Sequence, residues 1–333
     1  MSGELWRSQF QIGKEVSAGT AVAATRKMYF NVDDSVLTRE REPRPHRFAT
    51  GTRDNVRAYT QGPQVAGGRL SCPLSASELI ELFLIGLKGS VSPSNPSAGV
   101  DLWTFVPGST ALDAATLEWY DGGRGWRAVG AHVNSFNFRG SANGEHMVAM
   151  ELLARSVELN TITESLVDRV PDFIEGWETK VYIDSHEGTA GNTVKSNLLI
   201  NWDVTIDNQL GRKYWANNTN ALGDVIVGEI AVTARLLLEG AAAQSATEFA
   251  SWDAETLRLI RLEFGQNDVI SGGYKKFVTI DLPGAWSALD LGQIDAGTRA
   301  YELELQYVFD PTNQYGVQVR CQNARSAAWD NGS

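Results

Sequence analysis

The stretch that most constrains the fold covers residues 228–265, GEIAVTARLLLEGAAAQSATEFASWDAETLRLIRLEFG. Its first part alternates polar and apolar residues, which is the period of a half-buried strand. Ser245 or Thr247 then suits the N-cap of a short helix that places Phe249 and Trp252 on one face. Residues 256–264 return to extended character before Gly265. The pattern predicts a strand, a helix and a second strand.

The same order of elements occurs earlier in the chain, with a strand over residues 68–74, a helix over 75–87 and a strand over 102–106. This earlier helix is apolar nearly all round and must therefore be buried on more than one side. A neighbouring subunit is the covering that we expect. The candidate intersubunit residues on this helix are Leu79, Leu82, Phe83 and Leu87. The repeated order predicts two similar units, residues 1–170 and 171–333.

Each unit is predicted to contain a hairpin, and the two hairpins are expected to occupy corresponding positions. In the first, strands at residues 131–139 and 146–155 are joined by a short Gly/Asn loop. In the second, strands at 301–309 and 316–321 are joined by a turn that places Pro311 where a type I turn favours it. A poorly patterned connector at 156–176 separates the units.

A long polar passage at residues 33–67 contains two prolines and a cluster of arginines. Pro43 and Pro45 exclude a helix and disfavour an inner strand. Structureless loops of this length are uncommon in a compact domain unless they have a function. A projecting hairpin or arm and a solvated surface loop both fit the pattern. The basic residues of this passage are Arg39, Arg41, Arg44, Arg47, Arg53 and Arg57.

Composition indicates a folded soluble protein, with 43% hydrophobic and 21% charged residues and no apolar run long enough to cross a bilayer. The N-terminal sequence shows no apolar signal core. The net charge of −11 is uneven: residues 1–170 carry 17 basic and 18 acidic residues, and the remainder carries 12 and 22. A protein that grips DNA phosphates needs the opposite balance. An acidic protein that lets DNA slide past it does not.

Residues arranged for catalysis or for binding a cofactor or metal are not evident. The four histidines lack metal-ligand spacing, and neither a nucleophile elbow nor a phosphate-binding glycine loop is present. Cys72 and Cys321 are expected to be buried thiols. Ten tryptophans invite a sugar-binding interpretation, although several lie in patterned segments where core packing is the stronger expectation. We therefore expect no enzyme and no catalytic, cofactor or metal residue.

The order of these segments resembles that of tail tube proteins of long-tailed (siphovirus-type) bacteriophages. GKEVSAGTAVAATRKMYF (residues 13–30) is similar to the opening of one tube-protein family, and GRLSCPLSASELIELFLIGL (residues 68–87) to its strand and packed helix. GWETKVYID (176–184), the strand at 256–265 and VFDPTNQYGVQVRCQNA (308–324) resemble later landmarks. The similarity spans most of the chain.

The resemblance implies a mainly β fold of two β-sandwich or half-barrel tube units, each with a flanking helix, whose inner strands form an intersubunit β-barrel. It implies a structural virion protein, the major tail tube subunit, in stacked rings of three or six copies that conduct viral DNA without sequence-specific binding. Other partners would be the terminator, distal tail and tape measure proteins, with no membrane insertion. The chain would be made in the host bacterial cytoplasm and reside in the phage tail. The alternative is a β-sandwich module that binds carbohydrate or a receptor.

Overall fold

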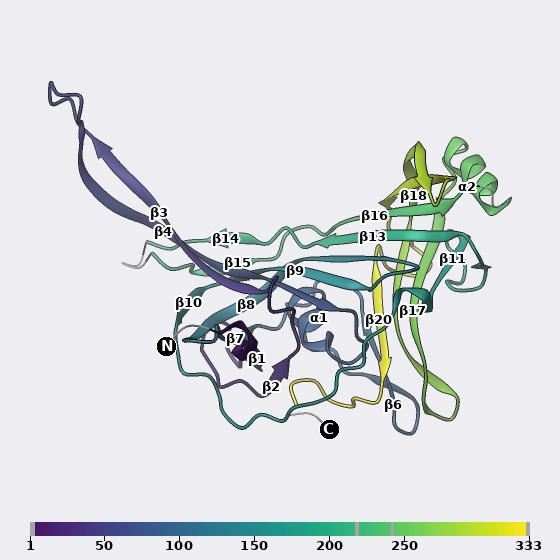
Figure 1. Ribbon diagram of the computed structural model, residues 1–333, viewed down its shortest axis with the longest axis horizontal. Helices are drawn as coiled ribbons and strands as arrows, with labels where there is room; N and C mark the ends of the chain where they lie inside the picture. Colours follow the sequence, from purple (N-terminus) through teal and green to yellow (C-terminus); the bar gives the residue numbers. More distant parts are fainter. Residues whose placement is uncertain (1–3, 217–219, 241–242, 331–333) are drawn as a thin grey trace.

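The computed structural model describes residues 4–216, 220–240 and 243–330, and it confirms the mainly β class. Two α-helices and many antiparallel strands form one elongated body, from which a long hairpin projects (Figure 1). The strands of the first half are β1 (Gln9–Lys14), β2 (Arg26–Met28), β3 (Val36–Arg47), β4 (Val56–Pro73), β5 (Ser94–Ser97), β6 (Val100–Phe105), β7 (Ala115–Tyr120), β8 (Gly125–Ser141), β9 (Met147–Ala154) and β10 (Ser156–Leu159). Those of the second half are β11 (Thr179–Ser185), β12 (Val194–Lys195), β13 (Leu199–Asp207), β14 (Gly211–Lys213), β15 (Asp224–Ile226), β16 (Ala231–Glu239), β17 (Arg258–Ser271), β18 (Tyr274–Asp295), β19 (Thr298–Tyr307) and β20 (Gln318–Asn323).

A central antiparallel sheet runs through both halves in the order β3-β4-β9-β8-β13-β16-β19-β18. The first four strands come from the first half of the chain and the last four from the second. The pairing of β8 with β13 is the joint between them. In each group of four, two strands in chain order are followed by the two strands of a hairpin in reverse chain order. This arrangement occurs twice along the sheet.

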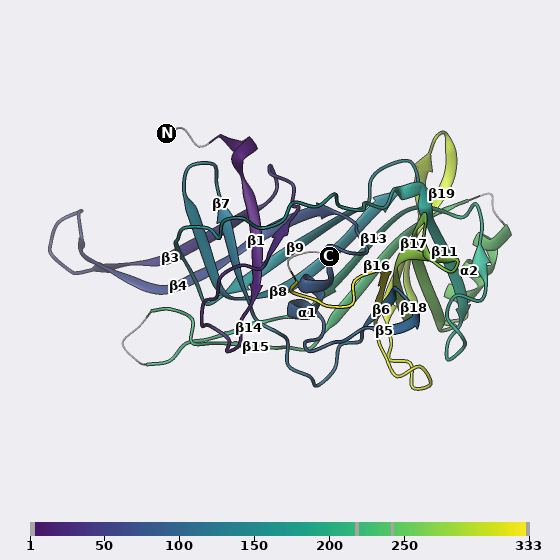
Figure 2. The same cartoon turned by 90° about the horizontal axis from the view of Figure 1, so that it is seen from below.

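A second layer of strands covers one face of the central sheet in each half. In the first half, β1 pairs with β2 and β7, while β7 and β10 flank the beginning of β8. In the second half, β11 pairs with β12 and β17, while β17 and β20 flank the beginning of β18. Strands β8 and β18 thus begin in the outer layer and end in the central sheet. The pair β5–β6 extends the second outer layer by pairing with β20 (Figure 2).

Alternating side chains determine which face of each central strand is buried. Along β13, Trp202, Val204 and Ile206 are buried, whereas Asn201 and Asp203 are exposed. This is the alternation expected of a strand with one face in the core and one in solvent. The hydrophobic core lies between the two layers and is continuous through both halves.

Each half contains one α-helix, α1 (Ile80–Gly86), which is buried, and α2 (Ala243–Asp253), which is partly exposed, and each has a short 3₁₀ turn, η1 (Leu5–Arg7) or η2 (Gly176–Glu178), ahead of its first strand. Helix α1 is shorter than the predicted 75–87. The Ser75 hydroxyl accepts hydrogen bonds from the backbone N–H groups of Ser77 and Glu78. These bonds hold a turn that precedes the helix rather than its first turn.

The predicted final hairpin is wrong. Strand β19 pairs with β16 and β18, whereas β20 pairs with β18 and β6. The turn at Pro311 does form, because the Asp310 carboxylate accepts backbone N–H groups from Thr312 and Asn313. That turn, however, carries the chain from the central sheet to the outer layer. The hairpin that corresponds to β8–β9 is β18–β19.

Candidate assembly surface

The outward face of the central sheet is polar and lined mostly by short side chains. One row across the strands reads Ala149, Asn137, Thr205, Thr233 and Gln306. The Asn137 amide donates to the carboxylate of Asp203 at 2.6 Å and to the hydroxyl of Thr205 at 2.9 Å. This face crosses the joint between the halves without a break.

Charged side chains on this face are mixed, with acids in excess. A neighbouring row brings together Arg139, Asp203, Arg235 and Glu304, and the Arg235 Nε atom lies 3.1 Å from a carboxylate oxygen of Glu304. The register places three arginines on this face and a larger number of carboxylates. They include Arg69, Arg139, Arg235, Glu40, Glu151, Asp203, Asp207, Glu239, Asp290, Glu302 and Glu304. Most of these carboxylates belong to the second half of the chain.

Both edges of the central sheet are open among the strands that the structure describes. At one edge, β3 pairs with β4 and with no second described strand. At the other, β18 beyond Gly284 pairs with β19 alone in the described chain. Open strand edges carry backbone groups that are ready to pair with another chain.

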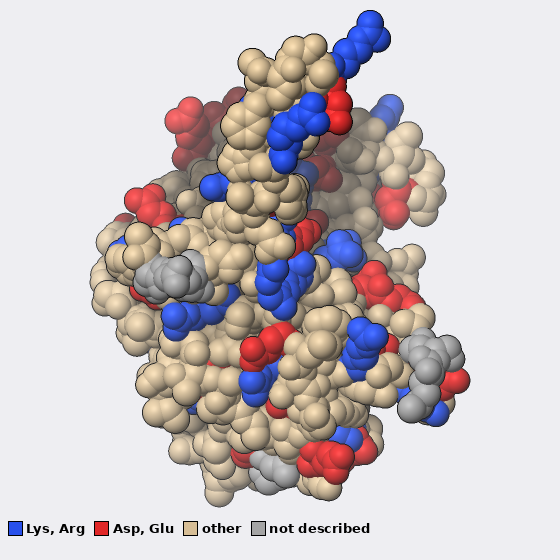
Figure 3. Space-filling view, turned by 90° about the vertical axis from the view of Figure 1, so that its left-hand side faces the viewer, with Lys and Arg blue, Asp and Glu red and all other residues tan. Residues whose placement is uncertain are grey.

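The predicted arm is a hairpin built from the distal parts of β3 and β4, and it projects far from the body (Figure 1). Its side chains are exposed from Thr38 to Gln61. Along the hairpin, Arg39 and Arg41 donate to Gln64 and Gln61. Nearer its end, Arg44 pairs with Glu42 and Arg57 donates to Thr52. Arg47 and Arg53 complete the six predicted arginines, and the arm also exposes Phe48 and Tyr59. In the space-filling view, basic side chains line the projecting arm (Figure 3).

A second, smaller arm in the other half extends in the same direction. Along the chain, β14 and β15 form a short antiparallel ladder in the connection from β13 to β16. The longer arm occupies the equivalent connection from β3 to β4 (Figures 1 and 2). The two arms touch: the Tyr214 hydroxyl donates to the carbonyl of Gln64 at 3.0 Å, and the Gln64 N–H donates to the carbonyl of Asn220 at 2.8 Å. The smaller arm therefore braces the base of the longer one.

A scan against protein families then decides the class. A family described as phage tail tube protein matches residues 6–275, which is most of the chain. This protein belongs to the phage tail tube protein family. The family is a structural one whose members are components of the virion tail. A comparison with curated proteins gave no significant match.

The matched range of this tail tube protein contains most of the predicted landmarks. Residues 68–87 contain the end of β4 and helix α1, residues 176–184 contain η2 and most of β11, and residues 256–265 contain the beginning of β17. The landmark at 308–324 lies beyond the matched range. It forms the Asp310 turn and β20.

The prediction of an intersubunit helix is wrong. Leu79, Leu82 and Phe83 are completely buried in the chain, and Leu87 is nearly so. Phe83 packs against the rings of Phe105, Phe136 and Phe138, with centroids 5.3 to 6.2 Å apart. Helix α1 can be apolar nearly all round because it lies between two layers of the same subunit.

A buried ion-pair network that sequence reasoning missed fixes this helix. Glu81 accepts from Arg325 at 2.5 Å and lies 3.7 Å from the Arg26 guanidinium, while Glu78 pairs with Arg26 and Arg169. Burial favours a raised pKa for Glu81, but Arg325 and Arg26 hold that pKa below its usual range. The three arginines are far from one another and from the two glutamates in sequence, so spacing gives no signal for the network.

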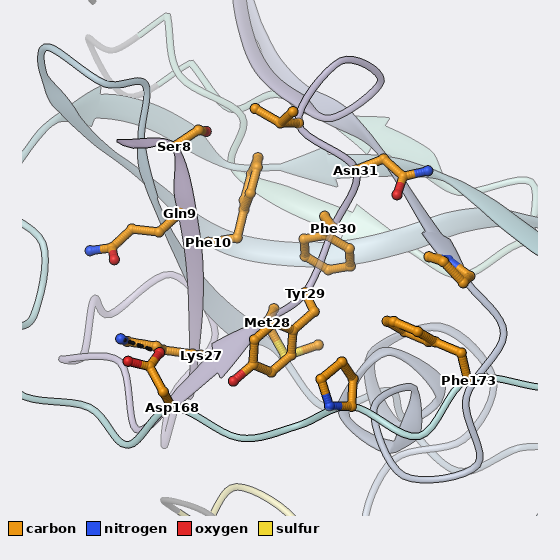
Figure 4. A pocket seen from close by; sticks show the side chains of 13 residues that line it. Ser8, Gln9, Phe10, Lys27, Met28, Tyr29, Phe30, Asn31, Asp168 and Phe173 are labelled. Atoms are coloured by element: carbon orange, nitrogen blue, oxygen red, sulfur yellow. Dashed lines mark hydrogen bonds and ion pairs between the residues drawn. The ribbon is translucent and has the colours of Figure 1, made fainter. Parts of the chain in front are cut away.

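Outside this network, two thiols and one pocket stand out among the described residues. Groups of three or more potential metal ligands do not occur among the described residues. Cys72 and Cys321 are buried free thiols, and burial raises the pKa of Cys72 to about 12. A cavity of about 430 Å³ near β1 and β2 is lined by aromatic side chains and by the Lys27–Asp168 ion pair (Figure 4). None of the described helices is long and apolar enough to span a membrane.

Proposed function

We propose that this protein is the major tail tube subunit, which closes into rings that stack as a hollow tube for the viral DNA. The observation that carries the proposal is the central sheet. One face is packed on the core, the other is polar and net acidic, and both edges are open. Such a sheet satisfies its edges when copies join side by side into a barrel.

In this ring the two halves, residues 1–170 and 171–333, act as two tube units. Support comes from the repeated strand order β3-β4-β9-β8 and β13-β16-β19-β18. Each unit supplies four strands, so three copies supply the positions that six single units would occupy. The ring then has threefold symmetry and pseudo-sixfold strand order.

The polar face becomes the wall of the channel. Its carboxylates outnumber its three arginines and give it a net negative charge, which repels DNA phosphates and prevents tight binding. Short side chains such as Ser135, Asn137 and Thr205 keep the wall smooth. DNA therefore passes without sequence-specific contact.

The basic arm joins one ring to the next. Its six arginines exceed its three acids, Glu40, Glu42 and Asp54, and exposed Phe48 and Tyr59 add apolar contact area. A complementary acidic surface on the adjacent ring is its partner. At the ends of the tube, the terminator, distal tail and tape measure proteins take the place of another ring.

Electron microscopy of the purified protein, together with the mass of its smallest ring, tests the proposal. We expect rings or tubes, with three chains in each ring. Compact particles that stay monomeric at high concentration would refute it and would favour the carbohydrate- or receptor-binding alternative.

The role of the arm has its own test. Changing Arg41, Arg44 and Arg47 to Glu reverses the charge of an exposed hairpin and should block stacking while single rings and the fold persist. A variant with the same three residues changed to Lys keeps the charge and serves as the control. Normal tubes from the Glu variant would reject this role for the arm.

A further inference from the structure

The chain contains its own example of how two tube units join. At the internal joint, β8 of the first half pairs antiparallel with β13 of the second, with Phe138 opposite Val204 and Asn137 opposite Thr205. Strand β8 is the last central strand of its unit, and β13 is the first of the next. The corresponding last and first strands of the whole chain are β18 and β3, which are the two open edges.

Paired residues fix which positions of the halves correspond. Arg69 lies opposite Glu151 in the first half, and Arg235 lies opposite Glu304 in the second. Each of these glutamates faces a register shift in the next strand, between Val133 and Ser135 or between Trp286 and Ala288. The agreement places the halves in one frame across all four strands.

In that frame, the residues of the internal joint map onto the open edges. Strand β13 pairs Val204 with Ala234, and β3 pairs Leu37 with Gly68, so Leu37 corresponds to Val204. Strand β8 pairs Asn137 with Ala149, and β18 pairs Asp290 with Glu302, so Asp290 corresponds to Asn137. Leu291 follows in the place of Phe138, at the start of the register shift between Asp290 and Gln293.

We propose that β18 of one copy pairs with β3 of the next in the register of the β8–β13 joint, which rests on the ring proposed above. The pairs are Leu37 with Leu291, Thr38 with Asp290, Arg39 with Leu289 and Glu40 with Ala288. The partner is a second copy of this chain, and the contact is heterologous, with edge β18 always meeting edge β3.

Burial at the two edges agrees with this pairing. Phe138 at the internal joint is 2% exposed, whereas Leu291 in the corresponding place is 55% exposed. The second copy would cover Leu291 and bring it to Leu37 on the core side of the sheet. An exposed leucine at an open strand edge gains burial from such a partner.

The polar side of the new joint also has a match. Asn137 donates to Thr205 across the internal joint. At the joint between copies the roles reverse, because the Thr38 hydroxyl donates to the Asp290 carboxylate. The two joints differ in two respects. Arg39 occupies the position that Ile206 has at the internal joint, and β18 has a further register shift after Asp290. The register is therefore assigned only from Ala288 to Leu291.

Disulfide trapping tests the register. Thr38 and Asp290 lie on opposite edges of eight strands, roughly 34 Å apart at about 4.8 Å a strand, so a bond between them within one chain is excluded. Assembled Thr38→Cys/Asp290→Cys protein, mildly oxidised, should convert from monomer to covalent multimers that end at three chains. The native thiols are buried and should not interfere.

A shifted pair, Thr38→Cys/Ala288→Cys, lies on the same face two residues out of register and should cross-link at least tenfold less. A mixture of the two single-cysteine proteins should give dimers and nothing larger. Rings that form while the shifted pair reacts faster would overturn the register and leave the ring standing. Folded variants that form no rings, like wild-type protein that forms none, would instead refute the proposed function.

Discussion

Loss of Arg325 should destabilise the subunit strongly, because it leaves the Glu81 carboxylate buried with an incomplete partner. Both carboxylate oxygens of Glu81 accept hydrogen bonds from the Arg325 guanidinium, at 2.5 and 3.3 Å. One of them also accepts the backbone N–H of Trp329 at 3.2 Å. Glu81 is completely buried and Arg325 nearly so. The pair therefore joins helix α1 to the segment that follows β20.

The size of the effect follows from what remains in Arg325→Met. The methionine fills part of the space, but the nearest remaining cation, Arg26, lies 3.7 Å away and also serves Glu78. Breaking a buried pair by removing one partner typically costs about 3–5 kcal/mol. A double change of Glu81→Gln and Arg325→Met removes both charges and should recover much of that loss.

Urea unfolding at pH 7, followed by tryptophan fluorescence, gives the free energy of unfolding. The matched control is Arg235→Met, which breaks the exposed pair with Glu304 and should cost at most about 1 kcal/mol. If Arg325→Met cost no more than this control, Glu81 would not depend on Arg325 and the reasoning would fail.

The same pair sets a direction for the pH dependence. The pKa of Glu81 is lowered in the folded state, so its stabilising contribution is present above the unfolded pKa, near 4.3, and is lost as pH falls through the folded value. In Arg325→Met, burial dominates and raises that pKa. The variant should therefore recover stability relative to wild type on acidification from pH 7.

Two further changes probe the core. Phe83→Ala removes a ring packed against three other phenylalanines and should cost about 3–5 kcal/mol in urea unfolding, while the exposed control Phe48→Ala should stay within about 0.5 kcal/mol; equal losses would contradict the assigned packing. Burial lowers the pKa of His146 to about 4, so the unfolded chain takes up the proton first and roughly 3 kcal/mol of stability is lost between about pH 6.5 and 4. His146→Gln should flatten this part of the pH profile, and an unchanged slope would count against a buried neutral imidazole.

Local pattern was sufficient to predict the strands and the arm. Alternation along residues 196–208 predicted the buried face of β13 that Trp202, Val204 and Ile206 provide. The prolines and arginines of residues 33–67 predicted a segment outside the core, and β3 and β4 carry it outward as a hairpin. In both cases the decisive information lies within one short segment.

Partners distant in sequence were beyond reach of the same reasoning. The apolar residues of α1 correctly predicted that the helix is buried on more than one side. The covering was assigned to a neighbouring subunit, because hydrophobicity does not indicate which chain supplies it. The predicted hairpin of β19 with β20 was wrong for a related reason. The residues around Pro311 determine the turn, but they do not determine which layer the next strand joins. The ion pairs of Glu81 combine residues from three distant segments and have no local signature.

If the two halves act as two tube units, as proposed, their presence in one chain has a consequence for assembly. In the proposed ring, three of the six joints are the covalently linked β8–β13 kind, and the other three form by association. Each intermolecular joint costs translational and rotational freedom, about 4–15 kcal/mol, which a joint inside one chain does not lose again. The pairing of the open β18 and β3 edges is therefore expected to be weaker than the internal joint. The position that Ile206 occupies at the internal joint is held at the open edge by Arg39, which is charged. Since the two arms of each chain also differ in length, contacts between stacked rings should repeat three times, with a long and a short arm alternating around the circumference.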